Sequence, residues 1–360
     1  MVDTKKIYMA PMEGVTGFIY RNTFARFFGG IDKYYTPFIS PGEHRNFKSR
    51  ELKDVLPDNN AGLNVAVQML TNNAEHFIVT ARKMMDFGYR EVNLNLGCPS
   101  GTVVAKGKGS GFLSFPEKLD AFLDEIYSGL ADTGLDISVK TRIGRYEQDE
   151  FYELLDIYNK YPISELIIHP RVQKDMYRNT PRMEIFDYAV EHSKNPLVYN
   201  GDICTVEDYE RFAGHYLKNA ENVPDESKSD KERNNKESDK ESAKITAVML
   251  GRGLISNPGL AGQIVSGSCT DRSTLRNFFD ELVLAYREEI PDEKNVVFKI
   301  KENLFYLVNL FEDKEEYWKK IRKYDNLMEL AAIARRMIGD GEFYSCLLYT
   351  SPSPRDTERS

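Results

Sequence analysis

The sequence lacks the features that usually mark an exported, disulfide-bonded or membrane-spanning protein. Its four cysteines, at positions 98, 204, 269 and 346, show neither a CxxC spacing nor the crowding of a disulfide scaffold, and this usage suits a reducing compartment. No segment reaches the roughly 18 consecutive apolar residues of a membrane span, and the first residues lack the apolar run of a signal peptide. We therefore expect a cytoplasmic protein with no metal site and no membrane contact.

The charge balance and the apolar content limit the possibilities further. A net charge of -8 does not indicate binding of nucleic acid, so any basic surface must be local. Because 41% of the 360 residues are hydrophobic, the chain can bury a sizeable core. The length exceeds that of a usual domain, although α/β barrels run to about 250 residues as one unit. We expect one large domain and one small one.

Eight short apolar runs rich in β-branched residues recur along the first two-thirds of the chain. Segments with helical spacing, such as 74–87, 117–130 and 150–161, lie between most of them. This alternation is typical of a parallel sheet with crossover helices, and eight such units close a barrel. We therefore predict a TIM (β/α)8 barrel over residues 1–266. Its strands are expected at 7–12, 33–39, 64–70, 91–98, 137–144, 165–171, 196–203 and 247–254.

Two intervals between predicted strands are longer than the others. The fourth and fifth strands begin 46 residues apart, whereas most begin 26 to 31 residues apart, and the extra chain there contains Cys98. The seventh and eighth begin 51 residues apart, and that interval contains residues 218–244, of which 15 of 27 are charged. So charged a tract cannot bury enough apolar surface to offset its ordering entropy. We predict that it is a disordered insertion.

After Gly267 the pattern changes to amphipathic helices without strands, expected at 275–289, 295–311, 315–323 and 326–337. We predict a helical domain over residues 267–340. Its cations come in tight groups, which form either a basic face or ordinary solvated helix surfaces; they are Lys299, Lys301, Lys319, Lys320, Arg322, Lys323, Arg335 and Arg336. Residues 341–360 show no period and resemble a translated sequencing adapter, so we expect an unstructured, non-native tail.

Polar or glycine residues stand at the ends of seven of the eight predicted strands. The exception is the second strand, which ends near Pro37. Because the active site of such a barrel lies at the carboxyl ends of its strands, this set predicts an active site. Its members are Pro11, Met12, Glu13, Gln68, Asn95, Cys98, Lys140, Arg142, His169, Arg171, Asn200, Gly201, Asp202, Gly251, Arg252 and Gly253.

Three of these strand ends suggest chemistry. The fourth strand delivers the Cys98 thiol, followed by a loop rich in glycine and lysine that we expect to be flexible and to close over a substrate. Lys140 is either a surface lysine or, since Val139 and Thr141 flank it, an inward one that meets an anion. The glycines and the guanidinium around Arg252 suit a phosphate, with a short helix expected after Pro258.

Seven segments together resemble the tRNA-dihydrouridine synthases, in order and at family-like spacing. They are MAPMEGVTGFIYR, VAVQML, VNLNLGCPSGTVVAKGKGSG, SVKTRIG, IIHPR, YNGDI and VMLGRG. The resemblance covers residues 7 to about 260 well and the helical domain loosely. It implies a TIM barrel that binds FMN, a helical domain that binds tRNA, and NADPH as the reductant.

The resemblance also implies a role for each site residue. Pro11, Met12 and Glu13 would border the flavin. Gln68 and Lys140 would contact its ring, with Lys140 stabilising negative charge near N1. The ribityl phosphate would be held by His169, Asn200, Gly201, Asp202, Gly251 and Arg252. Asn95 would bind the target uracil, and Lys106, Arg142 and Arg171 would meet phosphates of the RNA. Cys98 would protonate C5 after a hydride reaches C6, because an ordinary thiol, with a pKa of about 8.5 and no neighbour to lower it, keeps its proton.

Two other interpretations remain open. One is an FMN barrel that acts on a small molecule, such as a dihydroorotate dehydrogenase, in which a loop cysteine also follows Asn and precedes Pro. The clustered cations of the helical domain would then have no purpose. The other is an RNA-binding or chaperone protein with an inactive barrel, which Lys140, Cys98 and the phosphate loop disfavour. We expect a monomeric enzyme acting on tRNA.

Overall fold

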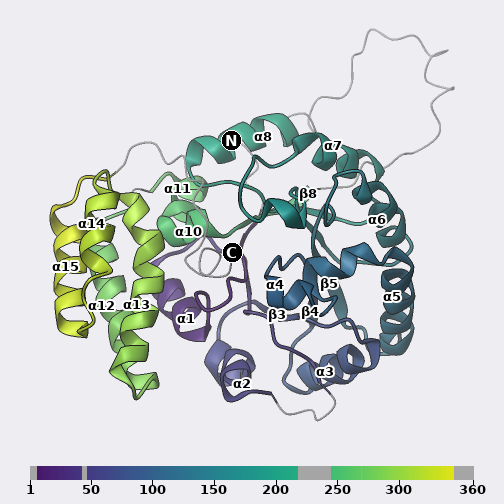
Figure 1. The fold of residues 1–360 in the computed structure, drawn as a ribbon, viewed down its shortest axis with the longest axis horizontal. Coiled ribbons are helices and arrows are strands. Elements are labelled where there is room, and N and C mark those ends of the chain that lie inside the picture. The colour runs from purple at the N-terminus through teal and green to yellow at the C-terminus, as the bar shows by residue number, and fades with distance from the viewer. Residues whose placement is uncertain (1–5, 43–46, 218–244, 269, 344–360) are drawn as a thin grey trace, which may run out of the picture.

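A computed structural model describes residues 6–42, 47–217, 245–268 and 270–343, and its central feature is a closed barrel of eight parallel strands (Figure 1). The strands pair in chain order and β8 pairs with β1. They are β1 (Lys6–Met9), β2 (Lys33–Tyr35), β3 (Val65–Met69), β4 (Glu91–Leu96), β5 (Asp136–Arg142), β6 (Leu166–His169), β7 (Leu197–Tyr199) and β8 (Ile245–Leu250). The predicted barrel is confirmed. All eight strands end earlier than predicted. The strands still contain Gln68, Asn95, Lys140, Arg142 and His169, whereas the other predicted site residues belong to the segments that follow.

Helices surround the barrel, and in Figure 1 α3, α5, α6, α7 and α8 follow its outer edge in turn. The helices of the barrel are α1 (Phe18–Phe27), α2 (Ser49–Val55), α3 (Ala74–Asp86), α4 (Gly101–Val104), α5 (Pro116–Leu130), α6 (Glu150–Tyr158), α7 (Met183–His192), α8 (Val206–Tyr216), α10 (Arg252–Ser256) and α11 (Leu260–Ser266). The predicted helix 150–161 is three residues shorter than expected. The helix after Pro258 is present as α11, while α10 begins directly at Arg252.

Residues alternate along each strand between the inside of the barrel and the layer under the helices. Tyr8, Ala66 and Ile167 belong to a separate buried cluster with residues of other strands, whereas Ile7 and Met9 belong to the larger core. This alternation is the ordinary period of a strand. It places every second side chain of β4 and β5 inside the barrel, among them Asn95 and Lys140.

Four further helices form the C-terminal helical region: α12 (Arg272–Glu289), α13 (Glu293–Leu307), α14 (Lys314–Ile321) and α15 (Leu327–Asp340). Phe278 of α12 joins it to the barrel by packing against Phe24 and Phe28 of the α1 segment, with ring centroids 6.4 and 5.1 Å away. Residues 341–343 were wrongly assigned to the tail. Phe343 pairs with Phe311, and their ring centroids are 5.5 Å apart.

Two predicted segments, the charged insertion at 218–244 and the tail from residue 344 onwards, lie outside the described residues. Among the helices that the structure describes, none combines the length and the apolar character that crossing a membrane requires.

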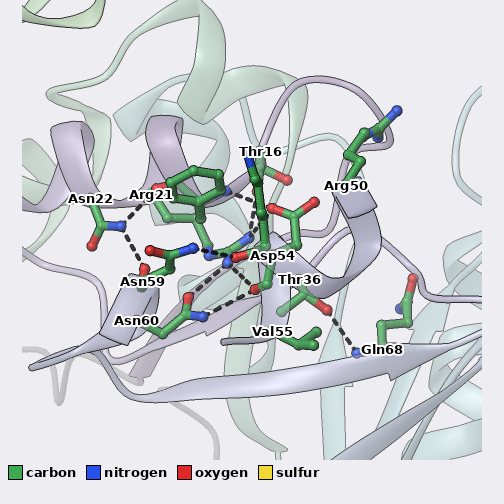
Figure 2. Close-up of polar contacts among 12 residues, drawn as sticks. Thr16, Arg21, Asn22, Thr36, Arg50, Asp54, Val55, Asn59, Asn60 and Gln68 are labelled. Atoms are coloured by element: carbon green, nitrogen blue, oxygen red, sulfur yellow. Dashed lines mark hydrogen bonds and ion pairs between the residues drawn. The ribbon is translucent and has the colours of Figure 1, made fainter. Parts of the chain in front are cut away.

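A buried ion pair fixes the loop that follows β1 (Figure 2). The Arg21 guanidinium donates to the backbone oxygen of Thr16 at 2.9 Å and to the Asn60 side chain at 2.7 Å. Asp54 lies 3.6 Å from Arg21 and accepts a hydrogen bond from the amide of Phe18 at 2.7 Å. Burial raises the pKa of Asp54, and the Arg21 charge opposes that shift. This ion pair anchors the chain between Met12 and α1.

Candidate active site

A cavity of about 940 Å³ opens at the carboxyl ends of the barrel strands. Every predicted site residue except Arg171 lines it. These lining residues are Pro11, Met12, Glu13, Gln68, Asn95, Cys98, Lys106, Lys140, Arg142, His169, Asn200, Gly201, Asp202, Gly251 and Arg252. The structure therefore brings together side chains that are up to 241 residues apart in the sequence, as the barrel topology requires.

The Asn95 side chain sets the direction of the backbone at Cys98. Its Oδ1 accepts hydrogen bonds from the amides of Gly97 and Cys98, at 3.0 and 2.9 Å. The carbonyl of Cys98 accepts from both the amide and the hydroxyl of Ser110, at 3.1 and 2.8 Å. Cys98 itself is half-buried at the wall of the cavity. The backbone amide and the backbone carbonyl of Cys98 are thus both hydrogen-bonded, and they fix the residue that carries the thiol.

A ladder of side-chain hydrogen bonds continues from Asn95 down the inside of the barrel. Asn95 Nδ2 bonds Gln68 at 2.7 Å, and Gln68 Nε2 bonds Asn93 at 2.8 Å. Asn93 then bonds Ser138 at 2.8 Å, and Ser138 bonds Glu91 at 2.6 Å. Each amide bonds its neighbour, which fixes side chains that burial would otherwise penalise. We name this set the polar ladder.

The loop after Cys98 is ordered, which corrects the prediction of a flexible lid. It contains α4 and a 3-10 turn at Gly109–Ser114, all but the last residue of which is buried. A Cβ at Gly109 would lie 2.8 Å from the Cys98 oxygen, and one at Gly111 would lie 2.6 Å from the Val104 oxygen. Glycine is needed there for close backbone approach, so its presence does not indicate flexibility.

Lys140 reaches the cavity from β5, beside Asn95 in the register of β4 and β5. Burial and the nearby Arg142 lower the pKa of Lys140 to about 7. Within the described residues no carboxylate pairs with it, so its ammonium group lacks a compensating negative charge. Lys140 and Arg142 also interact electrostatically with the Cys98 sulfur, and the expectation that this thiol keeps its proton stays a prediction.

The stability of the ligand-free protein should depend on pH through Lys140. In the unfolded chain its pKa is about 10.4, so between about pH 7 and pH 10 the unfolded state binds more protons and the folded state gains stability as pH rises. One such proton contributes a slope of about 1.4 kcal/mol per pH unit. Lys140→Met should lose this slope in urea titrations, whereas Lys106→Met, on the rim, should keep it. Parallel curves for wild type and Lys140→Met would contradict the assignment.

Arg171 and Arg252 meet at the carboxylate of Asp202. Arg171 donates to the two Asp202 oxygens at 2.8 and 2.5 Å, and Arg252 donates to one of them at 2.8 Å. Arg171 is fully buried and also bonds the backbone oxygens of Arg178 and Asn179. Its predicted contact with an RNA phosphate does not fit this position, because its donors are used inside the protein.

Asp202 is also unsuited to hold a phosphate directly, since both groups are anions. Its position between two guanidinium groups indicates that it orients Arg252 instead. Next to it, His169 Nε2 lies 3.1 Å from Arg171 and must accept, because a guanidinium only donates. Burial, and then the charges of Arg142 and Lys140, place the pKa of His169 well below its ordinary value. His169 is therefore neutral at pH 7.

Arg142 secures the loops around it. It donates from Nε to the Gly97 oxygen and from Nη1 to the Val172 oxygen, both at 3.0 Å. The ring of Tyr177 lies over Arg142 and Arg252, 5.3 and 4.8 Å from ring centroid to guanidinium carbon. Arg142 is only 1% exposed, so its predicted contact with RNA phosphate stays a prediction that this burial does not favour.

The charges of the cavity fit FMN, the cofactor that the resemblance implies. Its wall carries Lys140, Arg142 and Arg252, and Arg171 lies behind them. Asp202 is the carboxylate beside these cations, and the other lining carboxylate, Glu13, pairs with Arg50. Such an excess of cations suits a phosphate, and the uncompensated Lys140 suits negative charge on a ring. Gly253 allows the backbone after β8 to lie close to that of Ile203, because a Cβ at this position would be 2.4 Å from the Ile203 oxygen.

Several lining residues were missing from the predicted site. They include the rim cations Lys48, Arg50 and Lys108 and the aromatic residues Tyr177, Phe298 and Tyr306. Arg50 bonds Glu13 at 2.5 Å and so restrains the first loop. None of them stands at a strand end, and Phe298 and Tyr306 come from α13. Of these residues, only Lys108 was indicated by the sequence, because it belongs to the lysine-rich loop after Cys98.

Comparisons with known proteins establish the family. A family model described as "Dihydrouridine synthase (Dus)" matches residues 8–217, more than half of the chain. A probable tRNA-dihydrouridine synthase of Staphylococcus epidermidis is 26% identical over 257 residues, covering 69% of each chain. A tRNA-dihydrouridine(16) synthase of Aquipseudomonas alcaligenes is 26% identical, covering 72% of this chain and 75% of the relative. A solved variant of NCR from Zymomonas mobilis matches 76% of this chain and 90% of its own at 13% identity, with a TM-score of 0.42. The chain belongs to the dihydrouridine synthase family.

Proposed function

We propose that this protein reduces the 5,6 double bond of specific uridines in tRNA to dihydrouridine, with FMN bound in the barrel and NADPH as the reductant. The observation that carries the proposal is the placement of Cys98 and Lys140 in one cavity at the carboxyl end of the barrel. Enzymes of the family generally depend on a flavin, and the names of the relatives supply tRNA as the substrate.

The residues around the cavity have distinct tasks in this proposal. FMN, when bound, supplies the hydride that goes to C6 of the uracil. Lys140 and Gln68 would contact its ring, and Pro11, Met12 and Glu13 would border it. His169, Asn200, Gly201, Gly251 and Arg252 would hold its phosphate, with Asp202 orienting Arg252. Lys140 would pair with negative charge on the ring, which would remove the cost of burying its ammonium group alone.

Cys98 supplies the proton. Its Sγ holds a proton at the cavity wall and donates it to C5 of the uracil as negative charge develops there. Asn95 keeps one Nδ2 hydrogen beyond the one given to Gln68, and we assign that hydrogen to a carbonyl oxygen of the uracil. The same side chain would then position both the base and the thiol.

The RNA must present a base that is turned out of its stack, because a stacked base cannot reach the cavity. Lys106 and Lys108 lie on the rim, and each lowers the cost of bringing phosphates close. Burial and the neighbouring Lys106 lower the pKa of Lys108, so an approaching phosphate would favour its charged form. We also propose that the enzyme acts as a monomer in the cytoplasm, and that residues 267–340 form the tRNA-binding domain.

Purification and product analysis test this function. The purified protein should show a flavin spectrum, and tRNA from a strain that lacks the gene should gain dihydrouridine when incubated with the enzyme and NADPH. Absence of flavin even after addition of FMN would overturn the flavoenzyme assignment. Flavin-dependent reduction of a small molecule such as an orotate, with no change in tRNA, would instead support the small-molecule alternative.

Binding of tRNA should weaken steeply as the salt concentration rises. Lys and Arg side chains displace salt counterions from the RNA phosphates, and a higher salt concentration favours the return of those counterions. Four exposed cations on and after α14 are Lys319, Lys320, Arg322 and Lys323. Replacing all four with Gln should reduce the magnitude of the slope of log affinity against log salt by up to about 3 to 4, since each phosphate contact contributes roughly 0.7 to 0.9.

A matched control keeps the net charge of that variant but places the changes elsewhere. It replaces four exposed cations of the outer barrel helices and loops, namely Arg82, Lys118, Lys194 and Arg211. This control should leave the slope unchanged, and both proteins should retain FMN. If the two variants behave alike, the RNA-binding face lies elsewhere on the molecule.

A further inference from the structure

One large aromatic side chain is exposed at the rim of the active-site cavity. Phe298 of α13 is 51% exposed, whereas the preceding Val297 is buried. Among the exposed large hydrophobic residues in the described part of the chain, only Phe298 lines this cavity. Tyr306, two helical turns further along α13, lines it as well, so one face of this helix is turned toward the cavity.

The position of Phe298 is fixed by its neighbours. Lys299 Nζ donates to the backbone oxygen of Gly14 at 2.8 Å and bonds Glu302 at 2.9 Å. Gly14 follows Glu13, which bonds Arg50. Phe298 therefore stands on a helix that is tied to the loop bordering the cavity. Because the backbone that carries Phe298 is held in place, a partner would have to order only the side chain of this residue.

The charges of the rim indicate what kind of molecule this ring meets. Lys48 and Arg50 line the cavity on the side of α2, and Lys106 and Lys108 line it on the loop after Cys98. An exposed aromatic ring among cations is the usual arrangement for a single-stranded nucleic acid, in which bases stack on rings and phosphates meet cations. A purely apolar partner would leave these cations desolvated.

We propose that Phe298 is a stacking platform for the base of a nucleotide that neighbours the target uridine. This inference rests on the proposed function. When the target base leaves the stack to enter the cavity, an adjacent base loses one stacking partner. Phe298 replaces that partner at the rim and so favours the opened RNA. Because every base has a π-face, this subsite would accept any of the four bases.

Kinetics of the Phe298→Ala variant test the subsite. Stacking on one ring should contribute about 5- to 150-fold to affinity, so KM for tRNA should rise by a factor in that range while FMN content and flavin reduction by NADPH stay unchanged. Phe298→Leu keeps apolar area but lacks a π-face and should resemble Ala. Phe298→Tyr should restore the wild-type KM. Met328→Ala, at an 81% exposed position of α15, is the matched control and should have no effect.

The outcomes separate this inference from the proposed function. If wild type forms dihydrouridine and Phe298→Ala has an unchanged KM, or if Leu behaves like wild type, the stacking platform is wrong while the function stands. If wild type forms none, the function itself fails. As a second readout, Phe298→Trp in a Trp318→Phe background should show fluorescence quenching when tRNA binds. Unchanged fluorescence at saturating tRNA would overturn the subsite.

Discussion

Replacing Cys98 with alanine is expected to slow formation of dihydrouridine by about 10²- to 10⁴-fold, the range that a positioned general acid usually supplies. Hydride transfer to C6 leaves negative charge at C5, and without the thiol no side chain at that position can quench it. Binding of FMN and its reduction by NADPH should remain intact, because neither step uses the sulfur. Cys98→Ser should recover little, since a hydroxyl is a much weaker acid than a thiol.

The measurement is single-turnover oxidation of the pre-reduced enzyme by tRNA, which isolates this step from NADPH binding and product release. Cys204→Ala is the matched control. Cys204 lines the same cavity, but burial and then the charge of Asp202 raise its pKa to about 12, which makes it a poor proton donor at pH 7. Oxidation of Cys98→Ala at the wild-type rate would remove Cys98 from the mechanism.

Replacing Asp202 with alanine is expected to destabilise the protein by about 3–5 kcal/mol, the usual result of removing one partner from a buried ion pair. The variant leaves Arg171, whose side chain is 1% exposed, and Arg252, at 10%, without their shared carboxylate. FMN affinity should also fall, because Arg252 loses the group that orients it. Denaturant unfolding and flavin titration measure the two effects.

Two further variants separate charge from packing. Adding Arg171→Met to Asp202→Ala removes the stranded guanidinium, so the double variant should be more stable than Asp202→Ala alone. Asp132→Ala breaks an exposed pair with Arg82 and should cost no more than about 1 kcal/mol. A double variant no more stable than Asp202→Ala would show that the stranded charge is not the cause.

The sequence was sufficient to predict the barrel and the residues at the ends of its strands. Strand period and strand-to-strand spacing both follow from local geometry, so Lys140 and Asn95 could be placed inside the barrel without any knowledge of their contacts. Arg142 follows Lys140 by two residues, so the strand period places both side chains on the same face of β5. What a position on a strand cannot reveal is whether a partner inside the protein already uses the side chain.

Arg171 illustrates that limit. It stands at a strand end like Arg142, yet its guanidinium is consumed by Asp202 and by two backbone oxygens. Those partners come from different loops, and loop conformation has no simple period. The glycines after Cys98 led to the prediction of a flexible loop for a related reason. A glycine can allow either flexibility or close backbone approach, and the sequence does not distinguish the two. Phe298 was missed because its place at the cavity depends on how two regions of the chain dock.

The polar ladder has a direction, and that direction reaches the active site. Ser138 donates to Glu91, Asn93 donates to Ser138, Gln68 donates to Asn93, and Asn95 donates to Gln68, so every donor points toward one carboxylate. No amide in the series can turn over alone, because its donor would face a donor on one side and its oxygen an oxygen on the other. Glu91, which also binds Lys33 at 2.6 Å, thereby fixes the orientation of the whole series. The oxygen that Asn95 presents to the amide of Cys98 is set by a charge at the opposite, amino-terminal end of β4.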